Sequence, residues 1–308
     1  MNKKQTPRKK KMKKDFLEWW FYRIKDLKEK ADELYKQDQT RYEVGPQAIS
    51  KLAILAYYID IYSRIMKKRG KLCFVDLFAG CGLCKVRDSD VVILGSATLA
   101  YYIPKPSYNF DRIILFEKDH SNVNALKKRV PTADVFPGDV NKLPVDAIID
   151  NTCGSKNPFL AFVDPEGLEL EWETLKRILS RWSDVLINYH PEAVRRVHGR
   201  KDESSYSQTL DKFFGTAEWQ NLKYDDEEYF KLYIERIKTI KDVVEFIKVR
   251  GKGNYFYYIV LATRKTKANN PWLRAFLQLK QQIERTKGDL IELLLDIYSG
   301  RQARLSYF

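Results

Sequence analysis

The sequence predicts an α/β fold with a doubly wound, mostly parallel sheet and helical extensions at both ends. Three observations support this prediction: short apolar runs alternate with helical stretches, acidic residues follow several of the runs, and the first run leads into a glycine-rich turn. Alternating strands and helices are typical of parallel sheets. Because ligands of such sheets bind beyond the carboxyl ends of the strands, we expect the functional residues at that edge.

The first strand is predicted over residues 72–77 and ends in a glycine-rich turn. This run is short and apolar and contains a β-branched residue, which favours a strand over a helix. Ala79, Gly80 and Gly82 follow it, and they allow the backbone to bend sharply and to approach a ligand closely. An ordinary strand-to-helix turn has the same glycines, so the turn alone does not establish a binding site.

Four further strands continue the predicted sheet, and helices connect them. The strands are expected at residues 113–116, 133–136, 159–163 and 185–188. Two of the connecting helices are expected at residues 121–129 and 172–182. A closing antiparallel hairpin is expected from residues 244–249 and 254–264, which are rich in β-branched and aromatic residues.

Acidic residues stand at the ends of four of these strands. They are Asp76, Glu117, Asp139 and Asp164. Since the carboxyl ends of parallel strands meet at one edge, we expect these carboxylates to lie around one ligand. Each acid could instead cap a helix, although Glu117 fits that alternative less well because Glu is a poorer N-cap residue than Asp.

The rest of the chain is expected to surround the sheet. Residues 15–44 and 267–308 carry apolar residues at helical spacing and are predicted as N-terminal and C-terminal helical extensions. The main domain is expected over residues 45–266, with a helical insertion at about residues 199–242. Residues 1–14 contain eight Lys or Arg and no acid, so they are predicted to form a disordered basic arm.

Four segments together resemble class I S-adenosylmethionine-dependent methyltransferases and, more narrowly, the three-Cys-motif partner protein family. The segments are Ser50-Lys51-Leu52 leading to Tyr57-Tyr58, Asp76-Leu77-Phe78-Ala79-Gly80, Gly95-Ser96-Ala97 and Val163-Asp164-Pro165-x-Gly167. The resemblance implies a Rossmann-like catalytic domain, S-adenosylmethionine as the cofactor and a protein partner as in the family. Two departures are Cys81, where proline is frequent, and Glu166, where an aromatic residue is frequent. The second departure leaves the target atom open.

The resemblance also implies which residues bind the cofactor. They are Asp76, Phe78, Ala79, Gly80, Gly82, Glu117, Lys118, Asp139, Val140 and Asp164. In this assignment the turn lies against the methionine moiety, and Asp76 faces its amino end. Glu117 binds the ribose hydroxyls, and Asp139 accepts from the adenine amino group with Val140 beside the ring.

Methyl transfer from a sulfonium requires alignment of the reacting atoms more than acid–base chemistry. Asp164 and the carbonyl of Pro165 are therefore predicted to position the acceptor by accepting hydrogen bonds from an exocyclic amine. Tyr189, at the next strand end, is predicted to supply the stacking face that Glu166 does not provide. The alternative is that Tyr189 is only a packed residue at the rim.

The charge of the chain indicates a nucleic acid as the substrate. Lys and Arg number 55 against 41 acids, which gives a net charge of +14. Basic residues of the arm and of a later cluster are predicted to bind phosphates, namely Lys9, Lys10, Lys11, Arg195, Arg196, Arg200 and Lys201. RNA such as rRNA or tRNA is favoured because no duplex-reading module is evident. A solubilising or localising tail is the alternative for the arm.

Other functions remain open at this level. Lys51, Asp164 and a later Lys and Glu could serve a ribose 2'-O-methyltransferase, and DNA methylation or non-catalytic RNA binding are further alternatives. A small-molecule methyltransferase is disfavoured by the charge. Four scattered cysteines predict no disulfide framework, and Cys81-x-x-Cys84 has no second pair, so no metal is expected. Without a long apolar stretch or a secretory signal, the protein is expected to be soluble and cytoplasmic. Its oligomeric state is left open.

Overall fold

The computed structural model describes residues 16–251, 253–266, 270–286 and 290–301. The predicted basic arm and parts of the predicted C-terminal extension lie outside these residues. A central sheet has seven strands in the order β6-β5-β2-β7-β8-β10-β9. The strands are β2 (Cys73–Asp76), β5 (Arg112–Glu117), β6 (Asp134–Pro137), β7 (Phe159–Val163), β8 (Ser183–Tyr189), β9 (Val243–Arg250) and β10 (Phe256–Thr263).

The direction of the strands confirms the predicted doubly wound fold. β2, β5, β6, β7 and β8 are parallel, and β10 runs antiparallel to both β8 and β9 as the predicted hairpin requires. From β2 the chain winds outward through β5 to β6, and it then returns to β7 on the other side of β2. This reversal between β2 and β7 is a topological switch point, where such sheets bind ligands.

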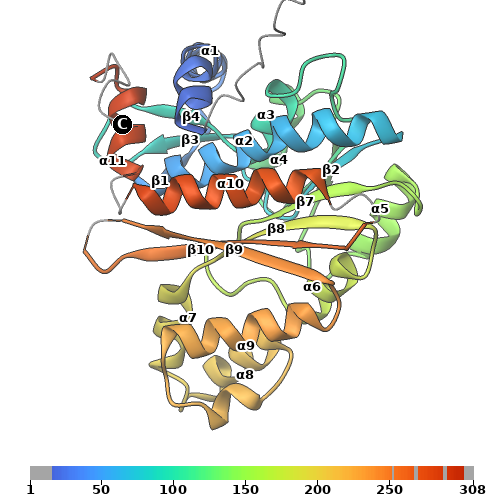
Figure 1. The fold of residues 1–308 in the computed structure, drawn as a ribbon, viewed down its shortest axis with the longest axis vertical. Helices are drawn as coiled ribbons and strands as arrows, with labels where there is room; N and C mark the ends of the chain where they lie inside the picture. Colours follow the sequence, from blue (N-terminus) through green and yellow to red (C-terminus); the bar gives the residue numbers. More distant parts are fainter. Residues whose placement is uncertain (1–15, 252, 267–269, 287–289, 302–308) are drawn as a thin grey trace, which may run out of the picture.

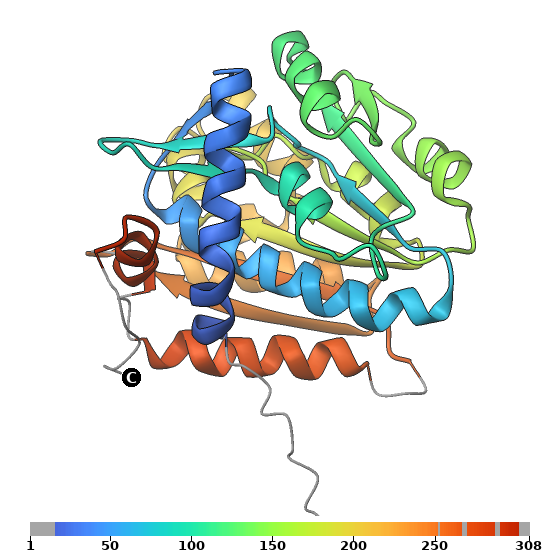
Figure 2. The ribbon, with the colours of Figure 1, turned by 90° about the horizontal axis from the view of Figure 1, so that it is seen from above.

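Helices cover both faces of the sheet (Figures 1 and 2). One face carries α1 (Phe16–Gln37), α2 (Gln47–Met66), η1 (Lys67–Arg69), α3 (Ser96–Tyr102), α4 (His120–Arg129), α10 (Pro271–Arg285) and α11 (Leu290–Tyr298). The other face carries α5 (Val145–Cys153), α6 (Trp172–Leu179), α7 (Pro191–His198), α8 (Ser204–Phe214), η2 (Glu218–Asn221) and α9 (Asp226–Lys238). Alternate strand residues enter the two cores: Phe74 packs with the first set and Val75 with the second.

A second, smaller sheet was not predicted. It consists of β1 (Tyr42–Val44), β3 (Leu83–Val86) and β4 (Val92–Leu94), with β1 parallel and β4 antiparallel to β3. β3 follows the glycine-rich turn directly, and α1 packs against β4. This sheet therefore connects the N-terminal extension to the turn.

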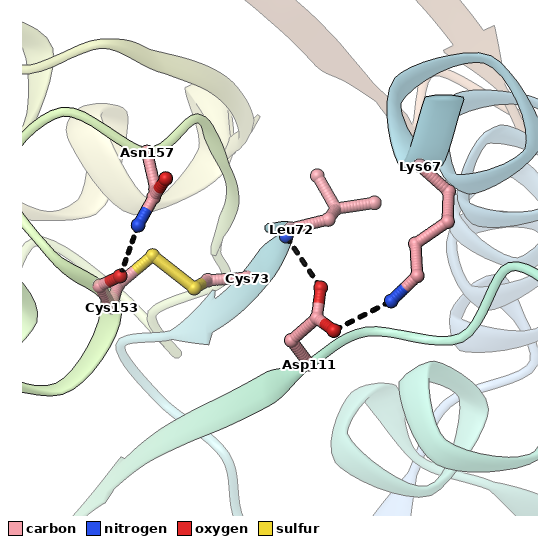
Figure 3. The surroundings of a disulfide bond; sticks show 6 residues. All are labelled: Lys67, Leu72, Cys73, Asp111, Cys153 and Asn157. Atoms are coloured by element: carbon pink, nitrogen blue, oxygen red, sulfur yellow. Dashed lines mark hydrogen bonds and ion pairs between the residues drawn. A yellow bond between two sulfur atoms is a disulfide. The ribbon is translucent and has the colours of Figure 1, made fainter. Parts of the chain in front are cut away.

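The prediction about cysteines was wrong for one pair. Cys73 at the start of β2 and Cys153 at the end of α5 form a buried disulfide across 80 residues of sequence. Figure 3 shows the bond, with the Asn157 amide donating a 2.6 Å hydrogen bond to the Cys153 carbonyl. The pairing depends on the packing of α5 below the sheet, which cysteine spacing does not reveal. Cys81 and Cys84 are thiols.

In the described ranges, none of the helices has both the length and the apolar character needed to cross a membrane.

Candidate functional site

A cleft of about 850 Å³ opens at the switch point, beyond the carboxyl ends of the parallel strands. This volume falls within the range of about 300–1,000 Å³ that is usual for small-molecule and cofactor sites. The cleft brings together most of the predicted site residues, namely Phe78, Ala79, Gly80, Gly82, Glu117, Lys118, Asp139, Val140, Asp164 and Pro165. Asp76 and Tyr189 are not among its lining residues.

The glycine-rich turn forms one wall of the cleft. Gly80 and Gly82 have φ values of +60° and +83°, which strongly favour glycine. A Cβ at Gly82 would lie only 2.9 Å from the Thr98 methyl carbon of α3. The Gly82 carbonyl also accepts hydrogen bonds from the Gly95 N–H at 2.9 Å and the Thr98 hydroxyl at 2.6 Å. The turn is therefore held against α3 with its backbone facing the cleft.

Asp76 lies beneath this turn and is fully buried. The N–H of Phe78 donates to its Oδ1 at 3.1 Å, and the Ser96 hydroxyl lies close to the carboxyl group, although Oδ2 makes no hydrogen bond of normal geometry with the described residues. Burial raises the pKa of Asp76 to about 7. The side chain thus offers an unpaired buried oxygen near the floor of the cleft, although Asp76 does not line it.

Glu117 and Asp139 occupy the neighbouring strand ends. Glu117 Oε1 accepts the Asp119 N–H at 2.8 Å, and it is Asp119 that caps α4 by accepting from Ser121 and Asn122. The capping alternative for Glu117 is therefore wrong. Asp139 accepts the Asn141 N–H at 3.0 Å within a local turn, and α5 begins only at Val145. Both carboxylates keep acceptor capacity toward the cleft.

The opposite end of the cleft contains a chain of polar contacts centred on Asp164. Lys51 Nζ lies 2.6 Å from Asp164 Oδ2, and Asn188 Nδ2 donates to Asp164 Oδ1 at 2.6 Å. Asn188 Nδ2 also lies 2.6 Å from His190 Nε2. Burial lowers the pKa of His190 to about 4, so its ring is neutral at pH 7. Sequence alone did not identify Asn188 and His190 as site residues.

The predicted stacking role of Tyr189 was wrong. Tyr189 is only 2% exposed and packs on the far face of the sheet against Phe230 and Tyr233, with ring centroids 5.1 and 5.2 Å away. Successive strand residues point to opposite faces, so Asn188 in the cleft directs Tyr189 away from it. The aromatic residues that line the cleft are instead Phe78, Phe116 and the three tyrosines Tyr42, Tyr255 and Tyr257.

The predicted basic cluster lies on and after α7 beside the cleft. Arg196 is exposed and lines the cleft. Arg195 bonds the Asp226 carboxylate, and Arg200 pairs with Glu203 at 2.9 Å, so both are engaged within the protein. Lys201 is exposed. Lys9, Lys10 and Lys11 lie outside the described residues.

The interior of the cleft is acidic in a chain of positive net charge. Its acidic lining residues are Glu43, Glu117, Asp139, Asp164, Glu166, Glu169 and Glu192. Its basic lining residues are Lys51, Arg87, Lys118 and Arg196. This balance favours neutral or positively charged groups inside the cleft and disfavours a buried phosphate.

No protein-family model matches the chain, and no curated protein matches its sequence. Among solved structures, a Legionella pneumophila protein described as family DUF519 has 12% identity, with 74% of this chain and 91% of that chain covered and a TM-score of 0.45. A plantazolicin methyltransferase in complex with SAH has 10% identity, 81% and 94% coverage and a TM-score of 0.40. A TehB-like SAM-dependent methyltransferase from Corynebacterium glutamicum has 11% identity, 66% and 86% coverage and a TM-score of 0.30.

At these TM-scores and identities, the structural similarities support no conclusion about the reaction. The argument about function therefore rests on the residues of the cleft. The resemblance to the three-Cys-motif partner family stays a prediction.

Proposed function

We propose that the protein is an S-adenosylmethionine-dependent methyltransferase that modifies an exocyclic amine of a base in structured RNA such as rRNA or tRNA. One observation carries the proposal: a single cleft holds Glu117 and Asp139 at one end and Asp164-Pro165 at the other. The first end offers acceptors for a nucleoside, and the second offers acceptors for a nucleophile. A donor and an acceptor substrate can therefore meet between them.

The residues at the first end fit the cofactor. The Oδ2 of Asp76, which makes no hydrogen bond with the described residues, suits a cationic amino group, and the residues of the glycine-rich turn line the cleft. Glu117 can accept from ribose hydroxyls and Asp139 from the adenine amino group. When bound, S-adenosylmethionine supplies an electrophilic methyl group.

The residues at the second end fit an amine. Asp164 and the Pro165 carbonyl accept the N–H groups and so direct the nitrogen lone pair toward the methyl group. Lys51 and Asn188 hold both oxygens of Asp164, which fixes the orientation of the carboxylate. As the N–CH3 bond forms and the S–CH3 bond breaks, the nitrogen releases one proton to solvent.

The charge distribution supports RNA as the substrate class. The acidic interior suits an uncharged base that has left its stack, while the exposed Lys201 after α7 and the cations of the predicted arm suit the phosphates outside. A cytoplasmic location, where such RNA is abundant, belongs to the same proposal.

The ion pair between Lys51 and Asp164 favours a second candidate, a ribose 2'-O-methyltransferase. Such an array would need a further lysine close to Asp164. Among the described lining residues the other lysine is Lys118, which follows β5 at the cofactor end. The base amine is therefore the preferred target.

Calorimetry with S-adenosylmethionine and transfer of tritiated methyl to total RNA test the proposal. Asp164→Ala should abolish transfer but leave cofactor affinity within a few-fold, because Asp164 positions the acceptor. Asp202→Ala, an exposed acid outside the cleft, serves as the control and should transfer normally. If the protein does not bind S-adenosylmethionine, the proposal that it is a methyltransferase is wrong. Label found only in a metabolite extract would contradict the RNA substrate, and nucleoside mass spectrometry would separate base from ribose products.

A further inference from the structure

We propose that the N-terminal extension completes the cofactor site, with Tyr42 bordering the sulfonium of S-adenosylmethionine. This inference rests on the proposed function and adds a binding residue that lies outside the predicted catalytic domain. Tyr42 belongs to β1, in the part of the chain predicted only as a helical extension.

The Tyr42 ring forms part of the cleft wall beside the glycine-rich turn. Two of its ring carbons would lie 3.3 Å from a Cβ placed on Gly80, so the ring lies close against the turn. Its hydroxyl accepts a hydrogen bond from Asn122 Nδ2 at 3.3 Å. Burial, reinforced by the negative charge of Glu117, raises the pKa of Tyr42 to about 12 and keeps the phenol neutral. The ring is thus placed near both Gly80 and Glu117.

A buried arginine fixes this segment to the turn. Arg129, the last residue of α4, donates from Nη1 to the Cys81 carbonyl at 2.7 Å. Its Nη2 donates to the carbonyls of Asp38 and Thr40 at 2.6 and 2.7 Å. These charge-assisted bonds connect the turn to the backbone that leads into β1. β1 then pairs with β3, with Tyr42 opposite Cys84. Tyr42 therefore keeps a defined position relative to the turn.

The covalent structure of the cofactor indicates which of its atoms would lie next to the Tyr42 ring. The assignment above places the methionine moiety at the turn and the ribose at Glu117, and the sulfonium joins these two parts. A ring close to both Gly80 and Glu117 therefore borders the sulfonium. The face of an aromatic ring attracts a cation, and the attraction is stronger when the contact is desolvated. The neutral sulfur of S-adenosylhomocysteine gains no such attraction.

The test compares the affinities of the full chain for S-adenosylmethionine and S-adenosylhomocysteine by calorimetry. Tyr42→Ala should weaken S-adenosylmethionine binding about tenfold and S-adenosylhomocysteine binding less, because only the first ligand carries the charge. Tyr42→Phe keeps the ring and should keep the wild-type ratio of the two affinities. Tyr22→Ala removes an exposed tyrosine of the same extension and should change neither affinity.

Two results would overturn the inference while the proposed function stands. In the first, the wild-type chain binds the cofactor and Tyr42→Ala binds both ligands equally well. In the second, Tyr42→Ala loses both affinities to the same extent, which indicates a structural role without contact to the sulfonium. If the wild-type chain binds neither ligand, the proposed function fails and this inference fails with it.

Discussion

Asp76 is a buried acid under the part of the cleft that faces the proposed amino end of the cofactor. Its Oδ2 makes no hydrogen bond of normal geometry with the described residues, and burial raises the pKa of Asp76 to about 7 although the Ser96 hydroxyl and the Phe78 N–H favour the carboxylate. Below that pH the group is mainly protonated in the unliganded protein. A cationic ligand near Oδ2 favours the carboxylate, so binding would release a proton.

Cofactor affinity should consequently depend on pH. We expect it to increase as pH rises toward about 7, by up to about tenfold per pH unit, and to level off above that value. Asp76→Asn has the same shape without the titration and should show a flat profile. Calorimetry in buffers of different ionisation enthalpy measures the proton release. A wild-type profile as flat as that of Asp76→Asn would contradict a cationic partner for this oxygen.

Single residues of the site were predictable where chemistry and position on the strand agreed. Glu117 ends β5, and Asp139 and Asp164 come within two residues of the ends of β6 and β7, so the parallel topology places all three in the cleft. Tyr189 could not be placed by chemistry alone, because the side of the sheet it faces depends on the alternation along β8. Tyr42 gave no signal either, since its role depends on contacts with segments distant in the sequence.

At the level of elements, the glycine-rich turn is the connection that the site depends on most. Gly82 needs a positive φ, and a Cβ there would lie 2.9 Å from the Thr98 methyl carbon. Gly253 offers a matched control, because its φ is +64° and a Cβ there would meet nothing within 4 Å. The two glycines thus share the backbone constraint and differ in the steric contact.

Gly82→Ala should lower the free energy of unfolding by about 1–3 kcal/mol and weaken cofactor binding, because the turn must move away from α3. Gly253→Ala should show only the backbone cost and leave cofactor binding unchanged. Thermal unfolding and calorimetry on the two variants measure both effects. Equal losses for the two variants, with cofactor affinity retained, would show that the contact with Thr98 does not matter.

The long elements followed from the sequence, whereas the small sheet did not. β7 occupies residues 159–163 as predicted, and α1 occupies residues 16–37 of the helical extension predicted over residues 15–44. β1 and β4 have three residues each, which is too short to show the alternation that marks a strand. β1 and β4 form because both pair with β3 and because Arg129 holds the backbone before β1 close to the turn. These contacts join segments that are distant in the sequence.

For the whole molecule, the charge of the chain and the charge of the cleft have opposite signs. The net charge of the chain is +14, and the first fourteen residues of the sequence contain eight of the cations. The lining of the cleft, by contrast, has seven acidic and four basic residues. If the proposed function holds, the cleft should receive the reacting base, and cations elsewhere in the chain should contact the phosphates.

Removal of residues 1–14 should lower RNA affinity and flatten its dependence on salt. The slope of log affinity against log salt should fall by at most about six units, since each neutralised phosphate of a single strand contributes about 0.7. A variant with the eight cations replaced by serine keeps the length and separates charge from chain length. Filter binding over a range of salt concentrations measures the slope. An unchanged slope would show that the arm does not contact RNA.

The disulfide between Cys73 and Cys153 closes a covalent loop that contains only some of the site residues. The segment between them contains the turn, Glu117 and Asp139, whereas Asp164 and Asn188 lie beyond it. In the chain-entropy model, closing a loop of this size raises the free energy of the unfolded chain by about 4–5 kcal/mol. The bond thus encloses the residues proposed to bind the nucleoside in one covalent loop and leaves the residues proposed to orient the nucleophile outside it. Cytosolic thiol pools rarely permit such a bond except in hyperthermophiles, so the oxidation state of this pair in cells would report the surroundings in which the protein operates.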